Sequence, residues 1–227
     1  MTLQIQGYYA ILDVKGSSLD LAAACRHASE LLAARPCCLQ LRAKQLSLAA
    51  MCELGRALRP LCTEHRVPLC VNDRLDVALA VAADVIHLGQ NDLPLAEVLR
   101  VRRAAHAESL VVGVSTHALD QAKAAAAGGA DYIGFGPVFP TTTKSDADPV
   151  VGLAALQDVA AAAAIPVVAI GGITLDNVAA VARAGASAAA VIAAVDGAPD
   201  RTLAGRRIAQ AFAAQNEAAR TSRQVRT

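Results

Sequence analysis

The chain has polar or cationic side chains at three alternate positions, Gln40, Arg42 and Lys44, and side chains of these types can bind an anionic group. The residues between them, Leu41 and Ala43, are apolar, and in a β-strand this alternation places the three polar side chains on one face. A half-exposed strand at a protein surface shows the same alternation. Because the other strand-like runs of the chain are apolar, we interpret the three side chains as one wall of an anion-binding site.

Two carboxylates, Asp73 and Asp92, follow consecutive strand-like runs at 68–72 and 85–88. Carboxylates without His or Cys at matching positions suit a hard cation such as Mg²⁺, which often binds substrate phosphates directly. The alternative is that each Asp caps the helix that follows it. Together with the cationic side chains Arg42 and Lys44, the two carboxylates indicate a site that binds Mg²⁺ and a diphosphate.

A second group of candidate anion ligands comes later in the chain. Gly171 and Gly172 follow a strand-like run, where a barrel often binds phosphate through backbone N–H groups, although a plain tight turn has the same residues. The longest connection, 137–152, contains Thr141, Thr142, Thr143 and Lys144, and we expect it to act as a lid. Two separate anion sites imply two phosphorylated ligands, or one ligand with phosphate at both ends.

The elements that must position these residues alternate regularly between strand and helix. The expected strands are 8–12, 37–42, 68–72, 85–88, 110–114, 132–136, 167–170 and 188–192. The expected helices are 20–34, 76–83, 95–105, 119–127, 153–163, 177–184 and 203–214, together with one that Ser47 caps and that runs on to about Pro60 or His65. This alternation predicts an α/β protein with a single (β/α)₈ TIM barrel. An open doubly wound sheet would need a glycine-rich turn after its first strand, and none follows 8–12.

Length and composition fit one barrel domain at 1–214, followed by a polar, frayed tail at 215–227. The chain has 227 residues, is 55% hydrophobic, and has a net charge of +1, which provides no general attraction for nucleic acid or a membrane. No run has membrane-spanning length, and 1–7 lacks the features of a signal peptide. We therefore expect a soluble, cytoplasmic protein, with its oligomeric state left open.

The six cysteines do not indicate a metal site or a disulfide framework. They form no CxxC pair, and most lie in apolar runs, where a reduced Cys acts as a small hydrophobic residue. Ser115 suggests a hydrolase nucleophile, but no nucleophile-elbow glycines surround it, and His117 is compatible with a surface position.

Six motifs, in order through nearly the whole chain, resemble thiamine phosphate synthase. They are Gln-Leu-Arg-Ala-Lys (40–44), Val-Asn-Asp (71–73), His-Leu-Gly-Gln-Asn-Asp (87–92), Gly-Val-Ser-Thr-His (113–117), Gly-Pro-Val-Phe-Pro-Thr-Thr-Thr-Lys (136–144) and Ile-Gly-Gly-Ile (170–173). The resemblance implies a transferase that joins 4-amino-2-methyl-5-hydroxymethylpyrimidine diphosphate to a thiazole ethyl phosphate. The products are thiamine phosphate and diphosphate, and the implied mechanism is dissociative.

The resemblance also implies a role for each matching residue. One Mg²⁺, shared with the substrate diphosphate, is bound by Asp73 and Asp92. The pyrimidine diphosphate is bound by Gln40, Arg42, Lys44, Asn72, Ser115 and Lys144, of which Arg42, Ser115 and Lys144 are assigned to catalysis. The thiazole phosphate is surrounded by Thr141, Thr142, Thr143, Gly172, Ile192 and Ala193.

The sequence departs from the family at two positions. Ala43 stands where the family usually has Glu, but the alternation turns this side chain away from the cationic face. Ala193 replaces a common Ser and removes one hydroxyl donor near the thiazole phosphate. Two other functions stay open: a thiazole tautomerase of the same barrel group, which would need neither metal nor diphosphate, and a non-catalytic regulator that binds phosphorylated ligands.

Overall fold

The computed structural model describes residues 4–141, 143 and 148–224. Eight parallel strands form a closed barrel in which each strand pairs with its neighbours in sequence and β1 pairs with β8. The strands are β1 (Gly7–Asp13), β2 (Cys38–Arg42), β3 (Leu69–Asn72), β4 (Val85–Leu88), β5 (Val111–Thr116), β6 (Tyr132–Phe135), β7 (Val167–Ile170) and β8 (Ala188–Val191). The predicted (β/α)₈ barrel is confirmed.

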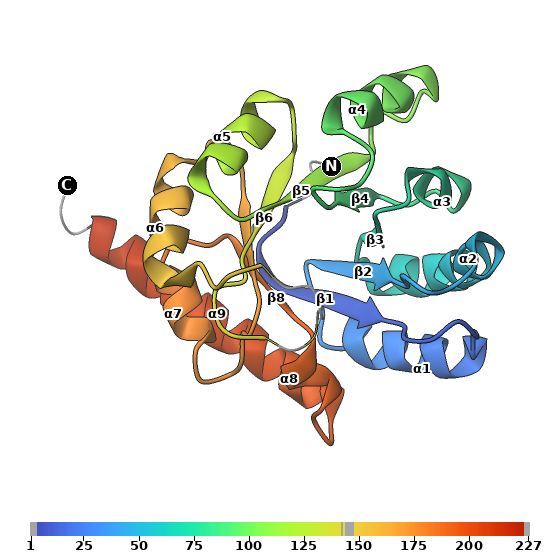
Figure 1. The fold of residues 1–227 in the computed structure, drawn as a ribbon. Helices are drawn as coiled ribbons and strands as arrows, with labels where there is room; N and C mark the ends of the chain where they lie inside the picture. Colours follow the sequence, from blue (N-terminus) through green and yellow to red (C-terminus); the bar gives the residue numbers. More distant parts are fainter. Residues whose placement is uncertain (1–3, 142, 144–147, 225–227) are drawn as a thin grey trace.

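Helices surround the barrel on its outside (Figure 1). They are α1 (Leu21–Leu32), α2 (Leu48–His65), α3 (Leu75–Ala80), α4 (Leu95–Ala104), α5 (Leu119–Ala127), α6 (Gly152–Ala162), α7 (Val178–Arg183), α8 (Ala193–Asp196) and α9 (Arg201–Gln224). Ser47 caps α2 as predicted, because its hydroxyl accepts a hydrogen bond from Ala50 N at 3.2 Å. No helix among the described residues is long and apolar enough to cross a membrane.

Two helical features differ from the prediction. The short helix α8 was not expected, and α9 continues to Gln224, where the sequence suggested a frayed tail from 215 onward. The segment 215–224 has no Gly or Pro and is rich in residues with good helix propensity, so it extends a helix that is already anchored. The anchoring includes an ion pair of 2.7 Å between Arg201 and Glu30 of α1.

The alternating directions of the strand side chains create two apolar layers. Residues such as Tyr8, Leu39 and Leu41 point outward and pack under the helices. Residues such as Tyr9 and Cys70 point inward and fill the lower part of the barrel. Polar side chains line the upper part of the barrel, at the carboxyl ends of the strands. Barrels of this type have their active sites at this end.

Candidate active site

A cavity of about 500 Å³ opens at the carboxyl ends of the strands. The structure brings together there most of the residues predicted to bind the pyrimidine diphosphate and the metal. Those that line the cavity are Gln40, Arg42, Lys44, Asn72, Asp73, Asp92 and Ser115. Lys144 lies outside the described residues.

Strand β2 and the residues after it form the cationic wall of this cavity. Gln40, Arg42 and Lys44 all face it, whereas Ala43 is buried in the outer layer, as the alternation predicts. Arg42 donates from Nη1 to Asp13 Oδ1, and both side chains are largely buried. The ion pair orients the guanidinium group at the rim.

Asp73 and Asp92 form a carboxylate pair and do not cap helices. The N-caps of α3 and α4 are Arg74 and Pro94, and neither cap makes a side-chain hydrogen bond, so the capping alternative is wrong for these two helices. Asp92 Oδ2 instead accepts a hydrogen bond of 2.6 Å from Gly89 N. Burial and the adjacent carboxyl group of Asp92 raise the pKa of Asp73 to about 6, partly offset by Lys44 and Arg42.

This donor set fits a hard divalent cation. Two carboxylates in mutual contact repel each other when both are ionised, and a cation between them removes that repulsion. The described residues contain no group of three or more His, Cys, Asp or Glu side chains suited to a metal. A cation held by Asp73 and Asp92 would therefore depend on water and ligand oxygens for its other positions, which is the usual situation of Mg²⁺.

A row of hydrogen-bonding side chains under the cavity was missed by the sequence analysis. Tyr9, His87 and Tyr132 line the cavity from below and link Gln40 to Ser115. The signal was present in the strand alternation, since all three occupy inward positions. Tyr9 and Tyr132 were counted only as members of apolar runs.

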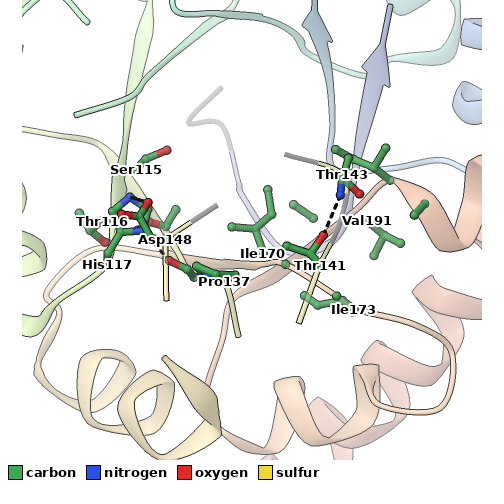
Figure 2. A pocket seen from close by; sticks show the side chains of 17 residues that line it. Ser115, Thr116, His117, Pro137, Thr141, Thr143, Asp148, Ile170, Ile173 and Val191 are labelled. Carbon is green, nitrogen blue, oxygen red and sulfur yellow. Dashed lines mark hydrogen bonds and ion pairs between the residues drawn. The ribbon is translucent and has the colours of Figure 1, made fainter. Parts of the chain in front are cut away.

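A narrower pocket adjoins the cavity on the side of β6, β7 and β8 (Figure 2). Of the residues predicted to surround the thiazole phosphate, it gathers Thr141, Thr143, Gly172, Ile192 and Ala193. Thr142 lies outside the described residues. Figure 2 shows Thr141 beside Thr143, whose backbone N–H donates to the Thr141 hydroxyl at 3.3 Å.

The two consecutive glycines of this pocket are required by close packing. Both have a positive φ, 98° for Gly171 and 61° for Gly172. A Cβ on Gly172 would lie 2.4 Å from the carbonyl oxygen of Pro140, and one on Gly171 would lie 2.5 Å from Pro137 Cβ. The glycines therefore let the β6–α6 connection lie against the end of β7, a specific role beyond that of a tight turn.

His117 belongs to the site and not to the outer surface. Its Nδ1 faces the carbonyl oxygen of Gly136, and its Nε2 lies 3.1 Å from Asp148 Oδ2 (Figure 2). Asp148 lies on the β6–α6 connection, so His117 ties the predicted lid to the end of β5. His117, Asp148 and Ser115 line both the large cavity and the narrower pocket.

The arrangement can hold two different ligands in contact. One space has cations and a carboxylate pair suited to a metal and a strongly charged group, and the other has hydroxyls, glycines and aliphatic side chains. Because the two spaces share lining residues, groups bound in them meet without an intervening wall. Such a site suits the transfer of a group from one ligand to the other.

Comparisons with known proteins agree with this description. A family model described as thiamine monophosphate synthase matches residues 9–195. The thiamine-phosphate synthase of Methanospirillum hungatei is 44% identical over 192 residues, covering 83% of this chain and 91% of that protein. The thiamine-phosphate synthase of Roseiflexus castenholzii is 48% identical over 168 residues, or 74% of this chain and 72% of that protein.

Among solved structures, the thiamine phosphate pyrophosphorylase of Pyrococcus furiosus superposes with a TM-score of 0.81 and 33% identity. The superposition covers 94% of this chain and 99% of that one. The family resemblance of the six motifs is thereby confirmed. The chain belongs to the thiamine monophosphate synthase family and is a transferase.

Proposed function

We propose that the chain condenses 4-amino-2-methyl-5-hydroxymethylpyrimidine diphosphate with thiazole ethyl phosphate and releases diphosphate. The observation that carries this proposal is the pair of adjoining spaces, one polar and charged, the other narrow and glycine-rich, which share Ser115, His117 and Asp148. The pyrimidine diphosphate occupies the first space and the thiazole phosphate the second.

In the proposed reaction the bond between the pyrimidine methylene carbon and the diphosphate oxygen breaks first. Its electron pair leaves with the diphosphate, and the lone pair of the thiazole nitrogen then forms the new C–N bond to the methylene carbon. Arg42 and Lys44 hold the diphosphate, and Lys144 is assigned to its leaving oxygen. No nucleophile from the protein is needed, so Ser115 acts as a hydrogen-bond donor.

The carboxylates Asp73 and Asp92 would hold one Mg²⁺ together with the substrate diphosphate. The chemistry that this ion supplies when bound is neutralisation of the negative charge on the departing oxygens. Asn72, a buried side chain that lines the cavity next to the carboxylates, is assigned to the diphosphate as well.

The decisive experiment measures diphosphate release by the purified protein with the pyrimidine diphosphate, with and without thiazole phosphate and Mg²⁺. Release that needs all three components, with thiamine phosphate formed in equal amount, supports the proposal. Isomerisation of a thiazole phosphate without metal would identify a tautomerase instead. Ligand binding without any turnover would identify a regulator.

A further inference from the structure

The short helix α8 carries one wall of the narrower pocket. Ile192 is the N-cap of α8 and Ala193 is its first residue, and both line that pocket. Ile192 also lines the large cavity, so it lies where the two spaces meet. A helix of four residues is not stable by itself. The contacts that hold α8 against the rest of the protein therefore also fix this wall of the pocket.

Two consecutive residues at the end of α8 provide these contacts. Val195 is fully buried in the outer apolar layer. Asp196, the only polar side chain among the four residues of α8, contacts α1, where its Oδ1 lies 2.9 Å from His27 Nε2. A carboxylate oxygen can only accept, so His27 Nε2 carries the proton and donates it. The contact joins residues that are 169 positions apart in the sequence, in helices on the same side of the barrel (Figure 1).

The contact between His27 and Asp196 is partly shielded from solvent. The two side chains are 22% and 27% exposed. Burial and the nearby carboxylate of Asp196 raise the pKa of Tyr8, a residue of β1 that points into the outer layer. The Asp196 carboxylate is therefore directed toward the barrel and not into open solvent. A hydrogen bond in such a position is stronger than an ion pair at the surface.

Two backbone hydrogen bonds connect the end of α8 to the pocket. Asp196 N donates to the carbonyl oxygen of Ile192 at 2.9 Å, and Gly197 N donates to that of Ala193 at 3.0 Å. A displacement of Asp196 is thus passed over one helical turn to the two residues that line the pocket. Because Ala193 has no hydroxyl, a phosphate beside it meets the backbone, and the position of that backbone decides the fit.

Helix α9 is tied to α1 separately, without α8. Arg201 Nη1 lies 2.7 Å from Glu30 Oε2, and the Thr202 hydroxyl donates to the carbonyl oxygen of Glu30 at 2.9 Å. These contacts hold the two longer helices together. Among the described residues of α1, His27 is the one whose side chain makes a polar contact with α8.

We propose that His27 and Asp196 are positioning residues that hold α8, and with it the wall formed by Ile192 and Ala193, in the place that a thiazole phosphate requires. The identity of this ligand rests on the proposed function. His27 lies on the outside of the barrel and lines neither space. The charged side of the cavity is built on β2, β3 and β4, so loss of the contact should weaken binding of thiazole phosphate much more than binding of the pyrimidine diphosphate.

The test compares the Kd for thiazole phosphate with the Kd for the pyrimidine diphosphate in the presence of Mg²⁺, both measured by calorimetry. In His27→Ala we expect the Kd for thiazole phosphate to rise about fivefold, the effect of one hydrogen bond, and the other Kd to change by less than about twofold. Asp196→Ala should have the same effect, and the double variant should bind no more weakly than either single variant. His27→Gln keeps a side-chain N–H for Asp196 and should restore most of the affinity.

Arg201→Ala is the matched control, because it removes an ion pair between α1 and α9 and leaves the contact of α8 in place. Thermal unfolding compares the stability of this variant with that of His27→Ala. The Kd of Arg201→Ala for thiazole phosphate should stay within about twofold of that of the unmodified protein. An equal loss of affinity in Arg201→Ala, or unchanged affinity in both His27→Ala and Asp196→Ala, would overturn the positioning role.

Hydrogen exchange without any ligand tests the positioning role apart from the proposed function. The backbone amides of 195–197 donate the hydrogen bonds of α8. Their exchange should become faster in His27→Ala and Asp196→Ala and stay unchanged in Arg201→Ala. If the unmodified protein does not bind thiazole phosphate, the proposed function is rejected, and the exchange rates still decide the role of His27. Exchange that is unchanged in His27→Ala would overturn that role.

Discussion

The two halves of the barrel mouth offer different means of binding the negatively charged groups of the proposed substrates. The half formed by β2, β3 and β4 uses charged side chains, above all Arg42, Lys44 and the pair of Asp73 and Asp92. The half formed by β6, β7 and β8 uses shape, with Gly172 allowing the chain to approach closely. Charged side chains suit a group whose charge changes during reaction, and a fitted backbone suits a phosphate that stays unchanged.

The strongest test of this contrast is Asp92→Asn in the charged half. We expect turnover with Mg²⁺ to fall by about 10³-fold, because the substitution removes a metal ligand and keeps the size of the side chain. Turnover is measured by thiamine phosphate formation over a range of Mg²⁺ concentrations, and folding by circular dichroism. Asp158→Asn, at an exposed position on α6, is the control. Retained activity with normal metal dependence would remove Asp92 from the site.

Lys144→Ala tests the connection between the two halves. We expect turnover to fall by about 10²-fold, with a much smaller change in thiazole phosphate binding, since the lysine is assigned to the leaving diphosphate. The measurement is kcat beside the Kd for thiazole phosphate. Lys123→Ala, on the exposed face of α5, controls for the loss of a lysine. Equal losses in turnover and binding would argue against the leaving-group role.

Gly172→Ala probes the half that depends on shape. The new Cβ would collide with Pro140 and displace the β6–α6 connection, so the KM for thiazole phosphate should rise by about tenfold, more than that for the pyrimidine diphosphate. Gly7→Ala is the control, because Gly7 also has a positive φ but no atom within 4 Å of its added Cβ. If both KM values rise together in Gly172→Ala, the two halves are not separate in function.

The smallest expected effect is a gain in affinity for the thiazole phosphate from Ala193→Ser, in the same half of the barrel mouth. A hydroxyl at this position would add one donor for the thiazole phosphate and tighten its binding by about fivefold. Titration calorimetry with thiazole phosphate measures the change. Unchanged affinity would mean that backbone N–H groups already make the contact and that the family's serine adds nothing here.

Prediction from sequence succeeded for features that depend on the residue pattern within a single strand. The alternation in β2 placed Gln40, Arg42 and Lys44 together and turned Ala43 away. The sequence also indicated the eight repeats of strand and helix, and with them the edge of the barrel at which the cavity opens.

What the sequence did not reveal depends on the register between strands. The pairing of Asp13 with Arg42 follows from their opposite positions in β1 and β2, which no local pattern indicates. The contact between the hydroxyl groups of Tyr9 and Tyr132 joins residues that are 123 positions apart. Apolar runs indicate strands but do not tell which tyrosine points inward.

The pairing of β1 with β8 has a consequence for how the protein is made. During synthesis β1 leaves the ribosome first, yet one of its two partners, Ala188–Val191, follows near the end of the chain. Until then β1 and β7 are open sheet edges with apolar side chains, the kind of surface that pairs with other chains. A nascent or truncated chain without β8 should therefore be prone to aggregation. The two strand edges are covered only when β8 pairs with β1 and β7 and closes the barrel.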